Sequence, residues 1–360
     1  MNTDRSTGPW PDVVVPPGEL LAETLAAKGM SQTDLATRTG RPPQALNEII
    51  KGKKAITPET AVELECVLGT PAYIWLNLER DYQYNKARLG NLKRLRAQVK
   101  GARAYPYAKM AGLGWVSATL DPVERVRELL KYFGVARLSA VSEVQSVAYR
   151  KSRARNTSPQ ALAAWLRKGE IEAAQVKTRP FARRKLRDSL PRIRKMTQLR
   201  PEEFQEPLCD LCAACGVALV FVPHLPKTHA NGAVRWLNKE TALVQLSVLH
   251  RYDDIFWFSL FHEIGHLLLH GKRDVFVESP DMEKTEKEKA ADRFATDKLI
   301  PPDDFKRLQA LTPLSHRAVT VFAQQIGVAP SIVVGRLQHE DLLPHTHLNA
   351  LRSKFKIVAC

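Results

Sequence analysis

Three residues in one apolar segment have the types and the spacing of a metal-dependent hydrolytic site. His262, Glu263 and His266 spell H-E-x-x-H within residues 256–271, FWFSLFHEIGHLLLHG. At the helical period the two imidazoles lie one turn apart on one face, with the carboxylate beside them. Two neutral imidazoles supply two of the three protein ligands that a catalytic zinc needs. The fourth position is then left for water.

A third ligand is expected from a helical segment about twenty residues further on, at residues 283–302. Glu288 and Asp292 lie one turn apart there. This spacing lets Glu288 coordinate the metal while Asp292 accepts a hydrogen bond from the far ring nitrogen of a ligand histidine. Glu286 lacks such a partner and is the weaker alternative. Glu263 is the expected general base, which takes a proton from water and passes it to the leaving amine.

The alternative for this constellation is a chance match of a five-residue pattern in a buried helix. Two histidines and a glutamate would then lie in a core-like run without a metal, which burial penalises. We therefore predict a metal site. Zinc is the expected ion, and a site of two histidines and one glutamate also admits manganese.

The elements around the motif predict a mainly helical protein with a small β-sheet, an α+β fold. Apolar runs at residues 216–222, 230–237 and 241–247 are typical of strands, and they precede the motif helix. An edge strand beside that helix could hold an extended peptide by strand addition. Residues 315–343 favour two further helices.

The cysteines are a separate question, because Cys209, Cys212 and Cys215 follow a C-x-x-C-x-x-C spacing. Such spacing could indicate a second metal or an iron–sulfur site. The surrounding segment is typical of the end of an apolar helix followed by a buried strand, so we expect small core residues instead.

Near the other end of the chain, short helical segments alternate with tight turns in a helix-turn-helix rhythm. Ser31 is the expected N-cap of one helix, and Gly40 ends it. The recognition helix is predicted from Pro42 to Lys51. Gln44, Asn47, Lys51 and Lys53 are the predicted DNA contacts, since amides read base edges and ammonium groups bind phosphate. The alternative is an ordinary helical packing module with solvated lysines.

Two resemblances extend these interpretations. Residues 17–82, with SQTDLATRTGRPPQALNEIIKGKKAITPETAVELECVLGTPAYIWLNLERDY, resemble the HigA-type antitoxins of the Xre family of DNA-binding proteins. This resemblance implies a five-helix operator-binding domain, commonly a homodimer, with Ile74, Trp75 and Leu76 closing the core.

Residues 201–302, with NGAVRWL, IFWFSLFHEIGHLLLHG and EKAADRFATDKLIPP, are similar to the ImmA/IrrE family of zinc-dependent metallopeptidases. This similarity implies a gluzincin-like site, cytoplasmic action and proteolysis of a transcriptional repressor. By position, His262 and His266 match the ligand pair, Glu263 the catalytic acid/base and Glu288 the third ligand.

The chain departs from that family at one point. The family often shows E-x-E-A-N or E-x-E-A-D, whereas Glu288 is followed here by Lys289, Ala290, Ala291 and Asp292. The second glutamate is therefore missing. The spacing from Glu288 to Asp292 favours the first glutamate as the ligand.

The length of 360 residues predicts two or three domains. We assign a flexible arm (1–16), a helix-turn-helix domain (17–84), a helical basic connector (85–200), a metallopeptidase domain (201–345) and a tail (346–360). Residues 150–200 hold 16 Lys and Arg against 3 Asp and Glu, a balance of +13 within a net charge of +16. Such a stripe suits phosphate backbones or acidic partners, and a solvated helical face is the alternative.

No basic-then-apolar leader opens the chain, and no apolar run approaches the roughly 18 residues of a membrane span. We therefore expect a cytoplasmic protein without a membrane partner. The leading hypothesis is a transcriptional regulator that binds operator DNA, fused to a zinc endopeptidase that cleaves a repressor or a toxin–antitoxin partner. The second is a HigA-type antitoxin or regulator whose peptidase-like domain binds metal or an effector without cleaving.

Overall fold

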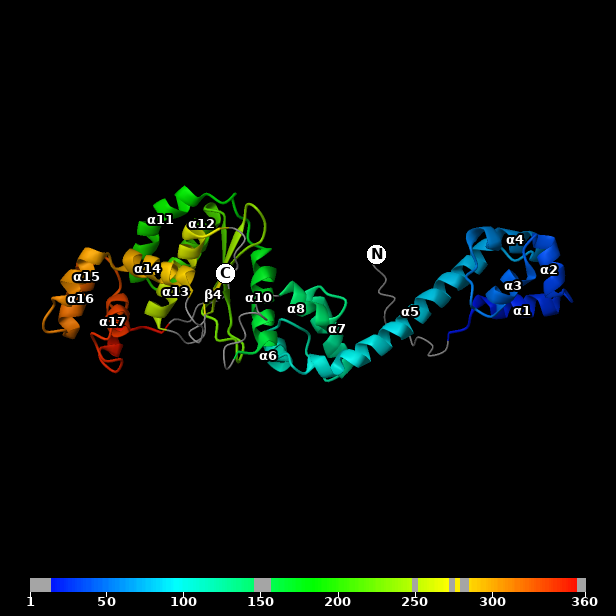
Figure 1. Cartoon of the computed structure of the whole chain (residues 1–360), viewed down its shortest axis with the longest axis horizontal. Helices are drawn as coiled ribbons and strands as arrows, with labels where there is room; N and C mark the ends of the chain where they lie inside the picture. Colours follow the sequence, from blue (N-terminus) through cyan, green and yellow to red (C-terminus); the bar gives the residue numbers. More distant parts are fainter. Residues whose placement is uncertain (1–13, 146–156, 248–251, 272–275, 279–284, 355–360) are drawn as a thin grey trace. The chain divides into compact units, whose positions relative to one another are not determined.

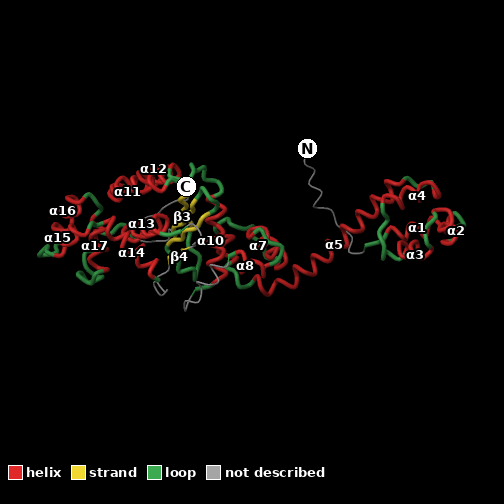
Figure 2. The backbone as a smooth tube through the Cα atoms, turned by 45° about the horizontal axis from the view of Figure 1, so that its top comes forward, coloured by secondary structure: helices red, strands yellow, loops and turns green. Residues whose placement is uncertain are grey.

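The computed structural model describes residues 14–145, 157–247, 252–271, 276–278 and 285–354. The chain forms two compact units, Met1–Val99 and Lys100–Cys360. Helices dominate both units, and the described strands all lie in the second (Figure 2). The predicted α+β class, mainly helical with a small sheet, is confirmed. Most of the predicted flexible arm, residues 1–13, lies outside the described residues.

From residue 14 onward, where its description begins, the first unit forms five helices: α1 (Pro17–Ala27), α2 (Gln32–Thr39), α3 (Pro43–Ile50), α4 (Pro58–Leu68) and α5 (Ala72–Ala102). Ser31 caps α2 as expected, because its hydroxyl accepts from the Asp34 amide while the Asp34 carboxylate accepts from the Ser31 amide, both at 3.1 Å. Gly40 ends α2 at a φ of 65°. Leu46 and Ile49 of α3 and Trp75 of α5 are buried in one core, so the expected closure by Trp75 is found.

Helix α5 runs through residue 84, where the sequence had placed the end of the helix-turn-helix domain. Its second half is rich in Lys, Arg, Leu and Ala, which favour helix. Gly90 and Gly101 weaken the helix there, each by about 1 kcal/mol relative to alanine. The contact division between the two units falls near its far end, between Val99 and Lys100.

The second unit holds the remaining helices and the sheet (Figure 1). Its helices are α6 (Tyr107–Gly112), α7 (Pro122–Phe133), η1 (Leu138–Ala140), α8 (Val141–Val144), α10 (Pro159–Ala173), α11 (Arg183–Lys195), η2 (Met196–Gln198), α12 (Pro201–Ala214), α13 (Asp253–Leu269), α14 (Glu286–Leu299), α15 (Pro302–Gln309), α16 (His316–Ile326), α17 (Pro330–His339) and η3 (Asn349–Leu351). Its strands are β1 (Val217–Val222), β2 (Gly232–Trp236), β3 (Ala242–Ser247) and β4 (Phe276–Glu278).

The described sheet has the order β1-β3-β2-β4. Strands β1 and β3 are parallel, while β2 is antiparallel to both β3 and β4. Helices α12 and α13 cover one face of the sheet and α10 covers the other (Figure 1). Because β1 and β3 are buried along their whole length, they are continuous apolar runs rather than alternating ones.

Helix α10 lies within the region that the sequence assigned to a connector, yet it forms a layer of the second unit. The indole nitrogen of Trp165 donates to Val222 O at 3.3 Å, and the Gln245 amide donates to Trp165 O at 2.7 Å. Buried Leu186 and Leu190 of α11 belong to the same core as the sheet. Residues 159–200 therefore help to build the unit that carries the motif helix.

The described part of the predicted tail also contacts the rest of the second unit. Arg352 donates to both carboxylate oxygens of Asp254 at the start of α13, at 3.0 and 2.9 Å. Its guanidinium lies 4.0 Å from the centre of the Tyr252 ring. The chain from α17 to residue 354 thus anchors the N-terminal end of the motif helix.

Cys212 and Cys215 are buried in the hydrophobic core, and burial raises the pKa of Cys212 to about 12. Both are the small core residues that the sequence predicted, whereas the prediction is wrong for Cys209, which is half-buried and disulfide-bonded. No single helix among the described residues is long and apolar enough to cross a membrane; α16 and α17 pass such a test only together, with a bend of 110° between them.

Candidate functional site

Helix α13 carries the H-E-x-x-H motif at the centre of the second unit. It packs on β2 and β3 with one side, while α14 and α17 cover others. A helix that is apolar on all sides is stable only when it is enclosed in this way. His262 and His266 are each 2% exposed, and Glu263 is fully buried. The polar motif therefore lies inside the protein rather than on its surface.

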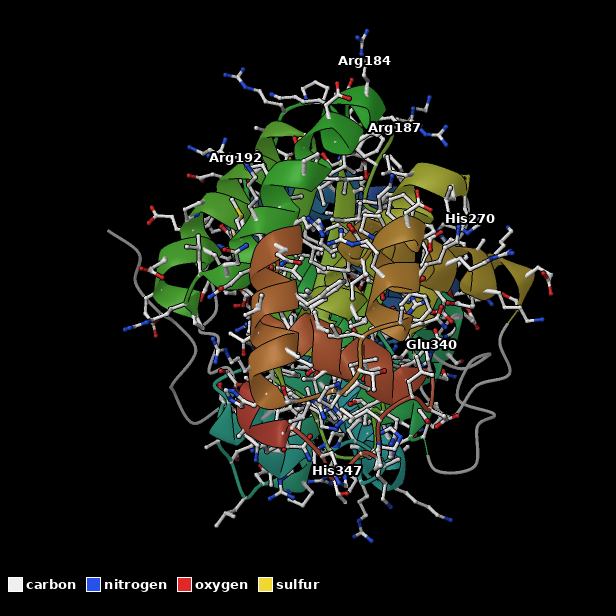
Figure 3. The ribbon with its side chains drawn as sticks, turned by 90° about the vertical axis from the view of Figure 1, so that its left-hand side faces the viewer. Arg184, Arg187, Arg192, His270, Glu340 and His347 are labelled. Carbon is white, nitrogen blue, oxygen red and sulfur yellow. The ribbon has the colours of Figure 1, made fainter. Side chains whose placement is uncertain are left out.

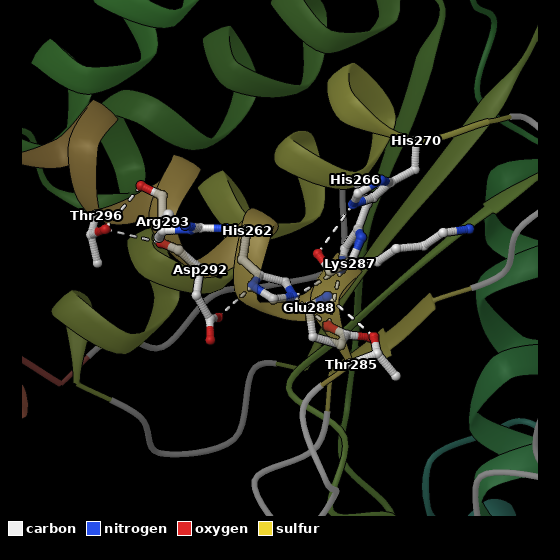
Figure 4. A network of polar contacts seen from close by, with 9 residues as sticks. All are labelled: His262, His266, His270, Thr285, Lys287, Glu288, Asp292, Arg293 and Thr296. Atoms are coloured by element: carbon white, nitrogen blue, oxygen red, sulfur yellow. Dashed lines mark hydrogen bonds and ion pairs between the residues drawn. The ribbon is translucent and has the colours of Figure 1, made fainter.

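The structure brings the three expected ligands together (Figure 4). The Nε2 atoms of His262 and His266 each lie 3.1 Å from Oε2 of Glu288, and 2.9 Å from one another. Among the described residues this is the group of ligand atoms close enough to hold one metal ion, all within 4.8 Å. Glu286, the weaker alternative in the sequence, has a side chain that is 82% exposed and pairs with Lys289.

Asp292 lies where the sequence placed it, beside the far nitrogen of a histidine. Its Oδ1 is 2.9 Å from Nδ1 of His262 (Figure 4). A carboxylate can only accept, so Nδ1 donates and the lone pair of the neutral ring lies on Nε2. That lone pair then faces the Glu288 carboxylate, a repulsive arrangement unless a cation lies between them. The donor set thus fits a divalent metal of the kind that takes nitrogen and oxygen ligands.

Helix α14 presents Glu288 because Thr285 caps it, with the Thr285 hydroxyl accepting from the Glu288 amide at 3.3 Å. Burial lowers the pKa of His266, against the hydrogen bond to Glu288, which raises it. Burial therefore favours the neutral imidazole, the form that binds metal. The imidazole also stacks on Phe276 of β4, with ring centroids 3.8 Å apart.

Glu263 is aimed at the sheet and lies against β2. A Cβ atom on Gly232 would come within 2.3 Å of Oε1 of Glu263, so only glycine leaves room for the carboxylate. Gly232 pairs with Leu246 of β3 in the sheet. The position of Glu263 thus depends on a residue about thirty positions earlier in the chain.

Sequence reasoning missed Gly232 and Phe276 as parts of the site. Gly232 lies in the NGAVRWL segment, where a glycine at the start of an apolar strand signals a close approach. Strand β4 has only three residues, too few for its alternation to be recognised. It is one of the two edge strands of the described sheet and contacts His266 through Phe276, so an edge strand lies at the motif helix.

The predicted DNA contacts lie on or just after α3. Gln44 is exposed and Asn47 is partly exposed, while Lys51 and Lys53 are exposed beyond the last helical residue. The opposite side of α3 is the one that packs in the core. All four side chains are at least partly exposed, and Gln44 and Asn47 lie one helical turn apart on α3.

The basic stripe of residues 150–200 divides into two kinds of side chain. Arg194 is partly buried and donates to the carbonyl oxygens of Leu299 and Ile326, at 2.9 and 2.6 Å. In contrast, Arg184, Arg187 and Arg192 point away from the body of the unit along α11 (Figure 3). Part of the charge is therefore structural, a division that the composition alone could not show.

Comparison with known families divides the chain in the same way. The helix-turn-helix family matches residues 21–75, and the family described as IrrE N-terminal-like domain, of the M78 peptidases, matches residues 228–338. An HTH-type transcriptional regulator of Escherichia coli is 31% identical over 84 residues, which cover 23% of this chain and 89% of that protein. Virulence-associated protein I of Dichelobacter nodosus is 36% identical over 72 residues, covering 20% of this chain and 67% of that protein.

Solved structures similar to the chain include two antitoxin proteins. The HigA antitoxin of Pseudomonas aeruginosa with the higBA promoter is 26% identical, covers 24% of this chain and 95% of that one, and has a TM-score of 0.23. A HigA-family addiction module antidote protein from Coxiella burnetii is 31% identical, with 24% and 92% covered and a TM-score of 0.21.

The fold and the family matches define a DNA-binding regulator domain joined to a peptidase-family domain. With its N-terminal part the chain belongs to the Xre-type helix-turn-helix regulators, and its C-terminal part is an IrrE/ImmA-like domain of the M78 peptidase family.

Proposed function

We propose that this chain is an operator-binding transcriptional regulator whose second unit is a metal-dependent endopeptidase acting on a repressor or on a toxin–antitoxin partner. The observation that carries the enzymatic half is the convergence of ligand atoms of His262 and His266 of α13 and Glu288 of α14 within 4.8 Å. Helix α13 also carries Glu263. Because its first unit would bind operator DNA, we expect the protein to act in the cytoplasm, where the chromosome lies. A homodimer is the expected form, since operators commonly have matching half-sites.

His262, His266 and Glu288 would hold the metal, for which zinc is our first choice and manganese the second. A divalent cation bound there polarises a peptide carbonyl and lowers the pKa of water. Asp292 holds the His262 ring in the metal-binding tautomer through the 2.9 Å contact. Glu263, set beside β2, takes the proton from the attacking water and delivers it to the leaving amine.

The enzymatic proposal is tested by Glu263→Gln in the full chain, with Glu286→Gln as the exposed control. Metal content is measured on purified protein, and cleavage is measured on a repressor or antitoxin encoded beside the gene. We expect near-stoichiometric zinc in all three proteins, with cleavage lost only in Glu263→Gln. Absence of bound metal at neutral pH would sink the enzymatic half. Zinc without any cleavage by the wild type would favour a regulator that binds metal and does not cut.

The DNA-binding half is tested on the gene's own upstream region. Asn47→Ala should relax sequence preference, while Lys51→Ala should weaken binding to all sequences and reduce the salt slope by about one. Lys109→Ala, which removes the same charge from an exposed position in the second unit, is the control. Binding that does not change with salt would contradict an operator contact through Gln44, Asn47, Lys51 and Lys53.

A further inference from the structure

A pocket of about 280 Å³ lies between α13, α14 and α17. Ile255 and Phe258 of α13, Leu299 and Ile300 at the end of α14, and Ile332 of α17 give it an apolar wall. His339, which also lines it, is exposed, so the pocket reaches the surface of the unit. Its size is near the lower end of the range for small-ligand sites, which suits one side chain rather than a whole cofactor.

The pocket adjoins the candidate metal centre through three of its lining residues. Phe258 precedes His262 by one helical turn, and their ring centroids are 6.1 Å apart. Thr296 donates to the backbone oxygen of Asp292 at 3.1 Å. Asn231 directly precedes Gly232, which lies against Glu263. A group bound in the pocket therefore lies beside the residues proposed to act on a peptide bond.

Two charged side chains that line the pocket, Asp254 and Arg336, each have a counter-ion. Asp254 is held by two hydrogen bonds from Arg352, at 3.0 and 2.9 Å. Arg336 pairs with Glu340 at 3.0 Å and stacks on another aromatic ring of the unit at 4.4 Å. Among the described residues, Nε and Nη1 of Arg336 are buried without a hydrogen-bond partner, but its charge is already matched by Glu340, so a further charged ligand group would lose its water for little added attraction. The pocket therefore favours an uncharged, apolar group.

We propose that this pocket binds one large apolar side chain of the protein substrate, such as leucine, methionine or phenylalanine, next to the bond to be cut. The inference rests on the proposed peptidase function and names the substrate class of that site. Burying such a side chain should improve the use of a substrate about tenfold or more over one with glycine at the same position.

Binding is tested first, with and without zinc, so that it does not depend on cleavage. The probes are N-acetyl-leucine amide and the α-amide of N-acetyl-aspartate. Their binding to the full chain is measured by ligand-observed NMR. Ile255→Trp fills the pocket from α13, and Thr296→Met fills it from α14 in case the first variant does not fold. Val321→Trp adds the same bulk on α16, at a position that is 43% exposed and does not line the pocket.

We expect the leucine amide to bind the wild type and Val321→Trp, and to bind the filled variants at least about tenfold more weakly. The aspartate amide should bind none of them. No binding of the leucine amide to the wild type, or equal binding to the filled variants, overturns the pocket assignment.

Cleavage is then mapped on a peptide library derived from a whole proteome, with zinc present. The bonds cut should carry a large apolar residue on one fixed side, and the filled variants should shift that preference toward glycine and alanine about tenfold in kcat/KM. Cleavage without this preference overturns the inference while the peptidase function stands. If no bond is cut but the filled variants lose leucine amide binding, the peptidase function fails and the apolar side-chain pocket stands.

Discussion

His262 contacts two acidic side chains of α14, and their roles can be separated. Glu288 faces Nε2 of the ring, whereas Asp292 faces Nδ1. Asp292→Asn places an amide where Nδ1 now donates to a carboxylate, so the ring loses its fixed tautomer and some basicity. We expect zinc affinity to fall about 10- to 100-fold, measured by competition with a chromogenic chelator. Asp297→Asn, exposed on the same helix, is the control; equal affinities in both variants would contradict the role of Asp292.

The space for Glu263 depends on Gly232. Gly232→Ala puts a methyl group 2.3 Å from Oε1 of Glu263, so the carboxylate or β2 must move. We expect a loss of about 1–3 kcal/mol in the free energy of unfolding, with bound zinc retained and cleavage strongly reduced. Gly271→Ala, where no atom lies within 4 Å of the added methyl group, should leave both properties unchanged. Thermal unfolding and metal analysis on the two variants decide the matter.

At the scale of single residues, the sequence predicted the polar side chains that the structure brings together. The helical spacing of His262 and His266, and of Glu288 and Asp292, was sufficient to predict which side chains would meet. Gly232 could not be found in this way, because its role is to lack a side chain at a contact that forms only when β2 packs on α13. A local pattern does not contain that contact.

At the scale of the structural elements, the start of α13 contacts the last described segment of the chain. Ser353 N donates to Asp253 Oδ1 at 3.1 Å, and Asp253 N donates to Ser353 O at 2.8 Å. Burial raises the pKa of Asp253 to about 6 from 3.8, and the negative charge of neighbouring Asp254 adds to the rise. The environment of the Asp253 carboxyl, which holds these two segments together, therefore disfavours its charged form.

The sign of the pH effect follows from that shift. The folded state binds the proton more tightly than the unfolded chain, so the contribution of Asp253 to stability is fully present below pH 3.8 and is lost as the pH rises through about 6. Asp253→Asn should therefore gain stability relative to the wild type between pH 4 and pH 7, on the order of 2 kcal/mol. Denaturant unfolding at several pH values measures it, with exposed Asp188→Asn as control. A constant difference across that range would contradict the assignment.

Elements with strong local signals were predicted well, and those defined by packing were not. In the sequence, Ser31 marks the start of α2 and Gly40 marks its end, and a proline pair marks the start of α3. Helices α10 and α11 were assigned to a connector, because their basic residues conceal the apolar side that contacts the sheet. The interior role of Arg194 is of the same kind, since its acceptors are the carbonyl oxygens of two distant helices.

At the scale of the whole molecule, the two units have separate hydrophobic cores. The core around Leu46, Leu64 and Trp75 shares no residue with the core around Phe204 and Trp257. The residue patterns and the resemblances placed one activity in each unit. The exact division was beyond them, because α5 continues as a regular helix from one unit into the sequence of the other.

Separate cores predict separate responses to ligands. A ligand that binds only the folded form of one unit stabilises that unit, by about 2.7 kcal/mol at a free concentration of 100 Kd. Zinc should therefore raise the unfolding temperature of Lys100–Cys360, and operator DNA that of Met1–Val99. Hydrogen exchange of the intact chain during heating assigns each transition to its unit. The zinc shift should vanish in His266→Ala and the DNA shift should shrink in Lys51→Ala, each without change in the other unit. A shift of both units by either ligand would contradict independent stabilisation and would show instead that binding at one site is coupled to the other.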